Sequence, residues 1–284
     1  MKKIGVCLAA SVLFCGCTTT KISPDVRNQL NQKQAILKTA PVAMIIDGCL
    51  LRNELGTDLI VAEQSNWTAE KFAGLLSQQL SDQGIQVGKK LKPFVCGYMP
   101  KEQLQEYDYK ADSEVTRVKV TQYPLINKDN VIRLTEQQQN SLLNLNQSFN
   151  RWQQLSINNL KEKKPTSNTL DLNNEDIAVL KDLTQANYIF IAALTGVEAS
   201  FGQKFTAGAL SVGISLATVG AGANFVSVLM PREGQHYLVH IVDLDKKEVF
   251  WTKAGILAGN LYSTKKHSVE AKAILDPLFE VPAK

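Results

Sequence analysis

The sequence predicts an α/β sandwich with a small mixed sheet, packed helices and a long helical insert. Residues 42–50 and 188–194 are apolar runs without helical periodicity, which is typical of strands covered on both faces. After the first run, residues 65–84 repeat apolar side chains three and four positions apart, which indicates an amphipathic helix. A further extended segment follows, and a strand, a helix and a strand within about fifty residues form a unit whose two strands should run parallel.

The boundaries of the first helix carry capping signals. Ser65 or Asn66 can cap its start, and Gly84 suits the left-handed residue that follows a last turn. Before the helix, residues 59–62 predict a short edge strand. After it, residues 85–87 return to an extended pattern.

The second half of the chain predicts two more helices and a hairpin. Alternation over residues 115–123 favours a solvent-facing strand. The Asn/Gln-rich insert at residues 135–164 predicts a long helix, because five apolar side chains recur at spacings of three and four: Leu142, Leu145, Phe149, Trp152 and Leu155. That stripe could bind a partner or pack on its own domain.

A shorter helix should start near Asn174 and lead into the strand at residues 188–194. Two further strands, residues 236–243 and 248–253, flank the turn-forming segment at residues 244–247 and predict a hairpin. Residues 268–278 predict a last helix, which Pro277 should bend or end.

The N-terminal residues predict export and lipid attachment. Two lysines precede an uncharged run of about eleven residues, which fits a signal peptide and is shorter than the roughly twenty residues a membrane-crossing helix needs. Gly16 before Cys17 resembles the bacterial lipobox, in which the cysteine becomes diacylated (palmitate being one such chain) and the new first residue. Cys15 is the rival site, but bulky Phe14 precedes it. Residues 1–16 are thus expected to be removed.

The expected mature chain has a polar tether at residues 17–40 and a folded body at residues 41–284. Thr18 follows the lipidated cysteine, and the resemblance to Gram-negative lipoproteins then implies the periplasmic face of the outer membrane, because Asp at this position is their usual signal for retention at the inner membrane. The mature chain has 29 basic residues (31 − 2) against 27 acidic ones. With no clustered basic face, that balance predicts no nucleic-acid partner.

Only Cys49 and Cys96 remain in the body once the N-terminal cysteines are assigned. In an oxidising compartment they could form a disulfide, and a loop of this length would stabilise the fold by about 4 kcal/mol. They could equally be two buried free thiols, which pack as small apolar residues.

No catalytic motif stands out in the chain. His236 and His240 project from one face of a strand without a carboxylate or cysteine at ligand spacing, so packing is favoured over metal binding. Asp47 at a strand end is the best lone carboxylate, but no acid–base partner can be named for it. We therefore expect no enzyme activity, no cofactor, no metal and no catalytic residue.

Three stretches of the chain resemble the CsgG-like envelope lipoproteins, which include curli-secretion lipoproteins and LpoB-type synthase activators. They are FAGLLSQQLSDQGIQV, LTQANYIFIAALTGV and YLVHIVDLDKKEVFWTKAG. The long insert and the Asp-Lys-Lys turn depart from the family pattern. The resemblance implies a CsgG-like α/β sandwich without enzymatic activity that binds another envelope protein, or itself, and helps assemble or stabilise an envelope machine.

The Gly/Ala-rich insert at residues 206–230 is uncharged and leaves the function open. It can be a membrane helix, a membrane β-hairpin, or a small-residue segment packed within the domain. A hairpin repeated around a ring would make the protein a ring-forming export-channel subunit of the curli-secretion type. A lipid- or glycan-carrying auxiliary subunit is a third class, which rests on similar folds alone.

Overall fold

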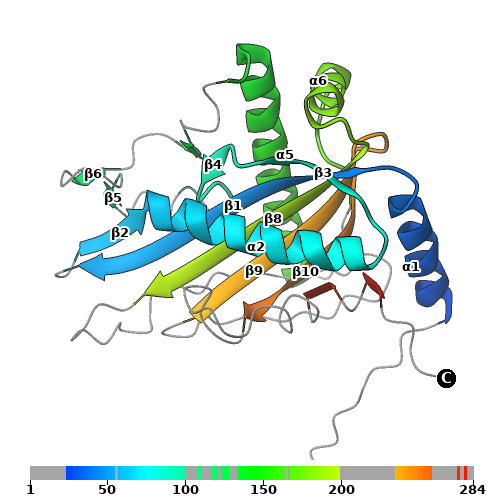
Figure 1. Cartoon of the computed structure of the whole chain (residues 1–284), viewed down its shortest axis with the longest axis horizontal. Coiled ribbons are helices and arrows are strands. Elements are labelled where there is room, and N and C mark those ends of the chain that lie inside the picture. Colours follow the sequence, from blue (N-terminus) through cyan, green and yellow to red (C-terminus); the bar gives the residue numbers. More distant parts are fainter. Residues whose placement is uncertain are drawn as a thin grey trace, which may run out of the picture.

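The protein is a mixed β-sheet with helices packed on both faces (Figure 1). The computed structural model describes residues 24–54, 57–99, 101, 108–110, 117–119, 123–127, 133–162, 164–165, 167–198, 234–257, 274–275 and 278–279. This arrangement confirms the predicted α/β class. The sheet is larger than the small one we expected, because eight strands belong to it.

The helices are α1 (Pro24–Leu37), α2 (Ala62–Asp82), α5 (Glu136–Lys161) and α6 (Asn174–Thr184). The strands of the large sheet are β1 (Val42–Glu54), β2 (Thr57–Val61), β3 (Val87–Leu91), β5 (Asp108–Lys110), β6 (Arg117–Lys119), β8 (Tyr188–Glu198), β9 (Gly234–Asp243) and β10 (Glu248–Leu257). A second, two-stranded sheet pairs β4 (Phe94–Val95) with β7 (Leu125–Ile126).

Strand β1 is the centre of the large sheet. It pairs in parallel with β8 along ten residues and with β3 at its start, as the strand–helix–strand prediction required. Its second half turns back antiparallel into β2, and β5 and β6 extend the sheet beyond β2. On the other side, β8, β9 and β10 follow as antiparallel neighbours, with β9 and β10 forming the predicted hairpin.

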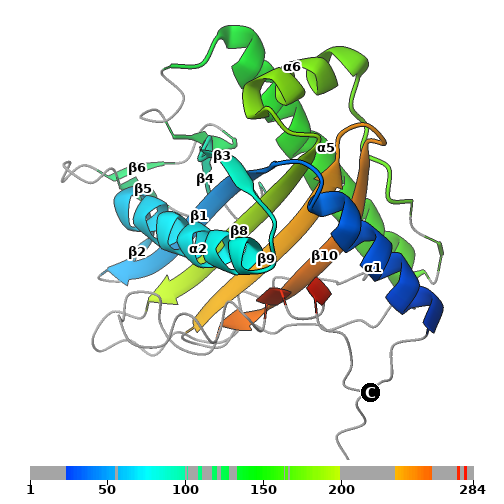
Figure 2. The same ribbon diagram turned by 45° about the vertical axis from the view of Figure 1, so that its right-hand side comes forward.

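One face of the sheet is covered by α2 and α1 (Figure 2). Met44 and Ile46 of β1 lie in the same apolar cluster as Phe72 and Leu76 of α2. Helix α2 approaches β1 so closely that a Cβ added to Gly48 would lie 1.9 Å from the backbone oxygen of Ser65. Glycine is therefore required at this crossing.

The opposite face is covered by α5 and α6. Ala43 and Ile45 of β1 pack in a second cluster with Leu142 and Phe149 of α5 and Leu180 of α6. Because side chains alternate along a strand, β1 supplies both clusters from successive residues. The predicted insert at residues 135–164 is thus the cover of one sheet face, and its apolar stripe packs on its own domain.

The predicted tether over residues 17–40 is wrong from residue 24 onward. Residues Pro24–Leu37 form α1, in which Leu30 and Leu37 are buried against the sheet. Lys33 donates from Nζ to the backbone oxygen of Phe250 at 2.6 Å, and burial lowers the pKa of this lysine. Two leucines seven residues apart share a helix face, so a largely polar segment still docks.

Several predicted boundaries also need correction. Helix α2 begins at Ala62, so Ser65 lies within it and bonds back to the oxygen of Val61. The predicted edge strand at residues 59–62 is β2, which has β1 on one side and β5 on the other. Leu155, assigned to the apolar face of the insert, is 55% exposed. Gly84 does adopt the predicted left-handed conformation, with φ of 77°.

Some predicted segments lie outside the described residues. These are the signal peptide, Cys17 and the Gly/Ala-rich insert at residues 206–230. Of the predicted last helix at residues 268–278, only Ile274, Leu275 and Leu278 are described, and all three are buried in the α2-side cluster. None of the helices in the described part of the chain has the length and apolar content that a membrane crossing needs.

Candidate functional site

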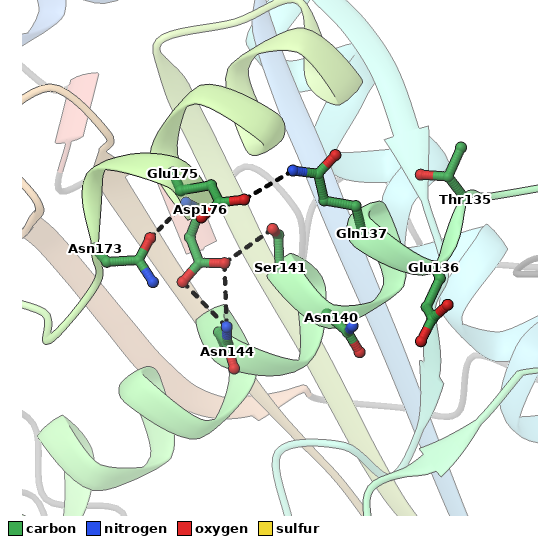
Figure 3. Close-up of a pocket in the computed structure, with 9 residues that line it drawn as sticks. All are labelled: Thr135, Glu136, Gln137, Asn140, Ser141, Asn144, Asn173, Glu175 and Asp176. Atoms are coloured by element: carbon green, nitrogen blue, oxygen red, sulfur yellow. Dashed lines mark hydrogen bonds between the residues drawn. The ribbon is translucent and has the colours of Figure 1, made fainter.

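The first turns of α5 and α6 converge on an open polar groove with a volume of about 600 Å³ (Figure 3). We call it the α5–α6 groove. Its lining is hydroxyl, amide and carboxylate side chains: Thr135, Glu136, Gln137, Asn140, Ser141, Asn144, Asn173, Glu175 and Asp176.

Both helices begin at the groove, where capping side chains accept hydrogen bonds from backbone N–H groups of the first helical turn. Thr135 and Gln138 form a reciprocal capping box, in which each backbone N–H donates to the other's side-chain oxygen, at 3.1 and 3.2 Å. Asn173 caps α6 by accepting the N–H of Asp176 at 2.7 Å. The predicted cap, Asn174, is instead the first helical residue and accepts from Lys247 Nζ at 2.8 Å.

Asp176 connects the two walls of the groove. Its carboxylate accepts the Ser141 hydroxyl at 2.9 Å and the Asn144 amide at 3.1 Å to each oxygen. At the rim, Gln137 donates to Glu175 at 3.0 Å (Figure 3). Because Asp176 is buried, its bonds to α5 set the distance between the helices.

The exposed lining groups are suited to binding a polar ligand. The amide of Asn140 can donate and accept, and the carboxylates of Glu136 and Glu175 accept. The Ser141 hydroxyl is already committed to Asp176. Across the described residues, no three His, Cys, Asp or Glu side chains are arranged to hold a metal ion.

A second polar cluster is buried on the α5 face of the sheet. The carboxylate of Asp47 on β1 accepts the backbone N–H of Tyr98 at 3.3 Å. Burial raises the pKa of Asp47 to about 7, against the backbone N–H groups of Gly97, Tyr98 and Cys96, which lower it. Burial also raises the pKa of the Tyr98 phenol. The lone carboxylate singled out in the sequence is thus enclosed rather than open to substrate.

Cys49 and Cys96, the two cysteines for which we considered a disulfide, are bonded in the structure, with Cα atoms 4.5 Å apart. Cys49 lies on β1 and Cys96 directly follows β4. Both residues are buried, at 2% and 0% exposure.

His236 and His240 lie on the α5 side of β9, as their spacing predicted. The ring of His240 packs edge-on against Phe149 at 4.4 Å and Trp152 at 5.8 Å, and its Nδ1 is 2.8 Å from the hydroxyl of Thr252. Burial lowers the pKa of His240 to about 3 and lowers that of His236. Both histidines are buried and belong to the core.

The groove was not predicted from the sequence, although its parts carried signals. The capping box at Thr135 and Gln138 and the acidic first turn after Asn173 mark two helix starts. What the sequence does not show is that two starts separated by nearly forty residues meet. That meeting depends on how α5 and α6 pack on the sheet.

Comparison with known proteins gives no relative for this chain: no protein-family model, no curated protein and no solved structure matches it.

Proposed function

We propose that the protein is an exported lipoprotein, anchored through Cys17 to the periplasmic face of the outer membrane, that binds another envelope protein and stabilises an envelope assembly without catalysing a reaction. Its fold would be of the CsgG-like type. The observation that carries the proposal is the bonded pair Cys49–Cys96 in the core. Disulfides form and persist in oxidising compartments such as the periplasm and are rare in the reducing cytosol, so the pair agrees with the export that the N-terminal residues predict.

The position of α1 restricts where such a protein could act. Only six residues, 18–23, separate Cys17 from the start of α1 at Pro24. Seven Cα–Cα steps extend at most about 25 Å. Since α1 packs on the sheet, the body would stay close to the bilayer surface, and its partner would have to lie there too.

The groove and the core support a binding role over a catalytic one. Groups with shifted pKa values are candidates for catalysis when they line a cleft, but Asp47 and His240 are 3% and 2% exposed. The open α5–α6 groove offers amides and carboxylates instead, which suit the backbone and polar side chains of a protein segment. The ring-forming channel depends on residues 206–230, outside the described part, and stays a prediction.

Palmitate labelling of growing cells tests the anchor. The native chain should incorporate label and fractionate with membranes, and the Cys17→Ser variant should lose both. Label that persists in the serine variant would remove the lipid assignment and the membrane placement with it.

Site-specific photo-crosslinking in the same cells tests the binding site. A photoreactive residue in place of exposed Asn140 in the groove should capture one envelope protein, identified by mass spectrometry. The same probe at exposed Gln78 on α2 is the matched control and should not. Equal capture from both positions, or none from Asn140, would contradict binding at the groove.

A further inference from the structure

A four-residue loop, residues 96–99, joins the central strand to one wall of the groove. Through Cys96 it is covalently bonded to Cys49 of β1. The carbonyl oxygen of Gly97 in this loop accepts hydrogen bonds from the side-chain amides of Asn146 at 2.8 Å and Asn150 at 3.2 Å, both on α5. The loop is therefore the polar link between β1 and α5.

The backbone of the loop needs an external restraint. Cys96 has a φ of 55°, a left-handed conformation that is unfavourable for a residue with a Cβ. Its N–H donates to the oxygen of Gly48 at 3.1 Å, and Asp47 accepts the N–H of Tyr98. Together with the disulfide, these bonds fix Gly97 so that its carbonyl points at α5.

The same loop presents an aromatic contact to α5. The ring of Tyr98 packs edge-on against Phe149, with centroids 5.3 Å apart. The Tyr123 hydroxyl donates to the oxygens of Gly97 at 3.3 Å and Met99 at 2.9 Å, and it accepts from Asn150 at 2.8 Å. Helix α5 is thus tied to the loop at residues 146–150, a segment that begins two residues beyond Asn144 in the groove wall.

We propose that the Cys49–Cys96 bond is an oxidative clamp that is set during folding: in the oxidised chain it fixes the loop, the loop fixes α5, and α5 then completes the α5–α6 groove. This role rests on the groove being the partner site proposed above. Oxidation removes two protons and two electrons from the two thiols and passes them to the disulfide of an exchange partner, which becomes a dithiol. The reduced chain would keep the α2 side of the sheet but hold α5 loosely.

The burial of the two cysteines decides how such a clamp works. A thiolate cannot reach a sulfur that is 0 or 2% exposed without local opening. The bond therefore closes once, while the chain folds, and the folded protein resists reduction.

Hydrogen exchange followed by mass spectrometry tests the clamp on the full lipoprotein in detergent. In the Cys49→Ser/Cys96→Ser double variant, amides at residues 96–99 and 141–150 should exchange at least tenfold faster, and this increase should exceed the increase in α2 and β9 at least threefold. A uniform increase across the chain, or no increase in α5, would overturn the clamp.

A second variant keeps the disulfide, in case the double variant does not fold. Asn146→Ala removes the 2.8 Å bond to Gly97 and should speed exchange at residues 141–150 at least threefold. Asn158→Ala, at an exposed position of the same helix, is the control and should leave these amides unchanged. Equal exchange in the two variants would contradict a link through Gly97.

Crosslinking from Asn140 separates this inference from the proposed function. If α5 loosens in the cysteine variant but Asn140 captures no partner even in the native chain, the clamp stands and the proposed function fails. If Asn140 captures the partner equally with and without the cysteines, and α5 stays protected, the clamp fails.

Discussion

The two faces of the central sheet differ in chemistry although β1 contributes to both. On the α2 face, Met44 and Ile46 meet the aromatic and aliphatic side chains of α2. On the α5 face, the alternate positions of the same strand include Asp47 and the bonded Cys49. His240 on β9 adds a neutral imidazole to that side.

The α5 face should therefore respond to the surroundings more strongly than the α2 face. Burial of apolar surface does not depend on pH or redox state. Buried carboxyl, imidazole and disulfide groups do, because each changes its bonding or charge when conditions change. We therefore expect the α2 face to set the basal stability and the α5 face to make that stability conditional.

Replacing Asp47 should have the largest effect on the difference between the two faces. Its folded pKa of about 7 lies above the ordinary 3.8, so the folded protein binds more protons than the unfolded chain between these values. Stability should fall as pH rises through this window, by about 4 kcal/mol in all above pH 7. Asp47→Asn should remove that loss.

Urea unfolding at pH 4 and pH 8.5 measures the Asp47 effect. The variant should be clearly more stable than the native chain at pH 8.5 and similar at pH 4. Asp171→Asn, at an exposed site, is the control and should change neither value. A native chain and an Asp47→Asn variant with parallel pH profiles would contradict the raised pKa.

Adding a methyl group at Gly48 should damage the α2 face by about 3 kcal/mol. Its Cβ would meet the Ser65 backbone oxygen at 1.9 Å, and overpacking of a closely packed crossing typically costs 1–3 kcal/mol. Gly74→Ala is the control, because no atom beyond its own helical backbone lies within 4 Å of its added Cβ and alanine favours the helix by about 0.5–1 kcal/mol. In thermal unfolding, Gly48→Ala should lower the midpoint temperature and Gly74→Ala should raise it, at every pH.

Histidine 240 should make the α5 face sensitive to acid. Its folded pKa of about 3 lies below the ordinary 6.5, so the unfolded chain binds the extra proton and stability is lost as pH falls through this window. At pH 5 the loss should be about 2 kcal/mol. His240→Gln should flatten the profile between pH 7 and pH 5, and an unchanged slope in chemical unfolding would count against the buried neutral imidazole.

The cap of α6 should contribute the smallest effect. Asn173→Ala removes the acceptor for the Asp176 N–H and should destabilise the protein by about 1 kcal/mol. Asn158→Ala is the comparison and should stay within about 0.5 kcal/mol. Unfolding midpoints that shift equally in both variants would contradict a stabilising contribution from the Asn173 cap.

The sequence could predict the parts of the fold that depend on local pattern. The continuous apolar runs gave the core strands, and residues 244–247 gave the hairpin turn, in which Lys247 adopts a φ of 55°. The extension of β1 to Glu54 was missed because Arg52 and Glu54 look like a polar loop. They become strand only through pairing with β2.

Other features escaped because they depend on distant contacts. Helix α1 reads as a tether, since its composition is polar and its contacts with the sheet come from a few residues far apart in sequence from their partners, such as Leu30, Leu37 and Lys33. The groove residues are the Asn, Gln and Glu of ordinary solvated helices, and only the packing of α5 on the sheet brings them together. Cys17 and residues 206–230 lie outside the described residues and remain predictions.

We expect the mature chain to be both lipidated and oxidised, and mass spectrometry tests the two modifications together. Mass spectrometry of the protein from its native membranes, intact and after non-reducing digestion, should find a chain that lacks residues 1–16, carries acyl groups on Cys17 and contains a linked Cys49–Cys96 peptide. A full-length chain without lipid, or free thiols at both cysteines, would contradict the account.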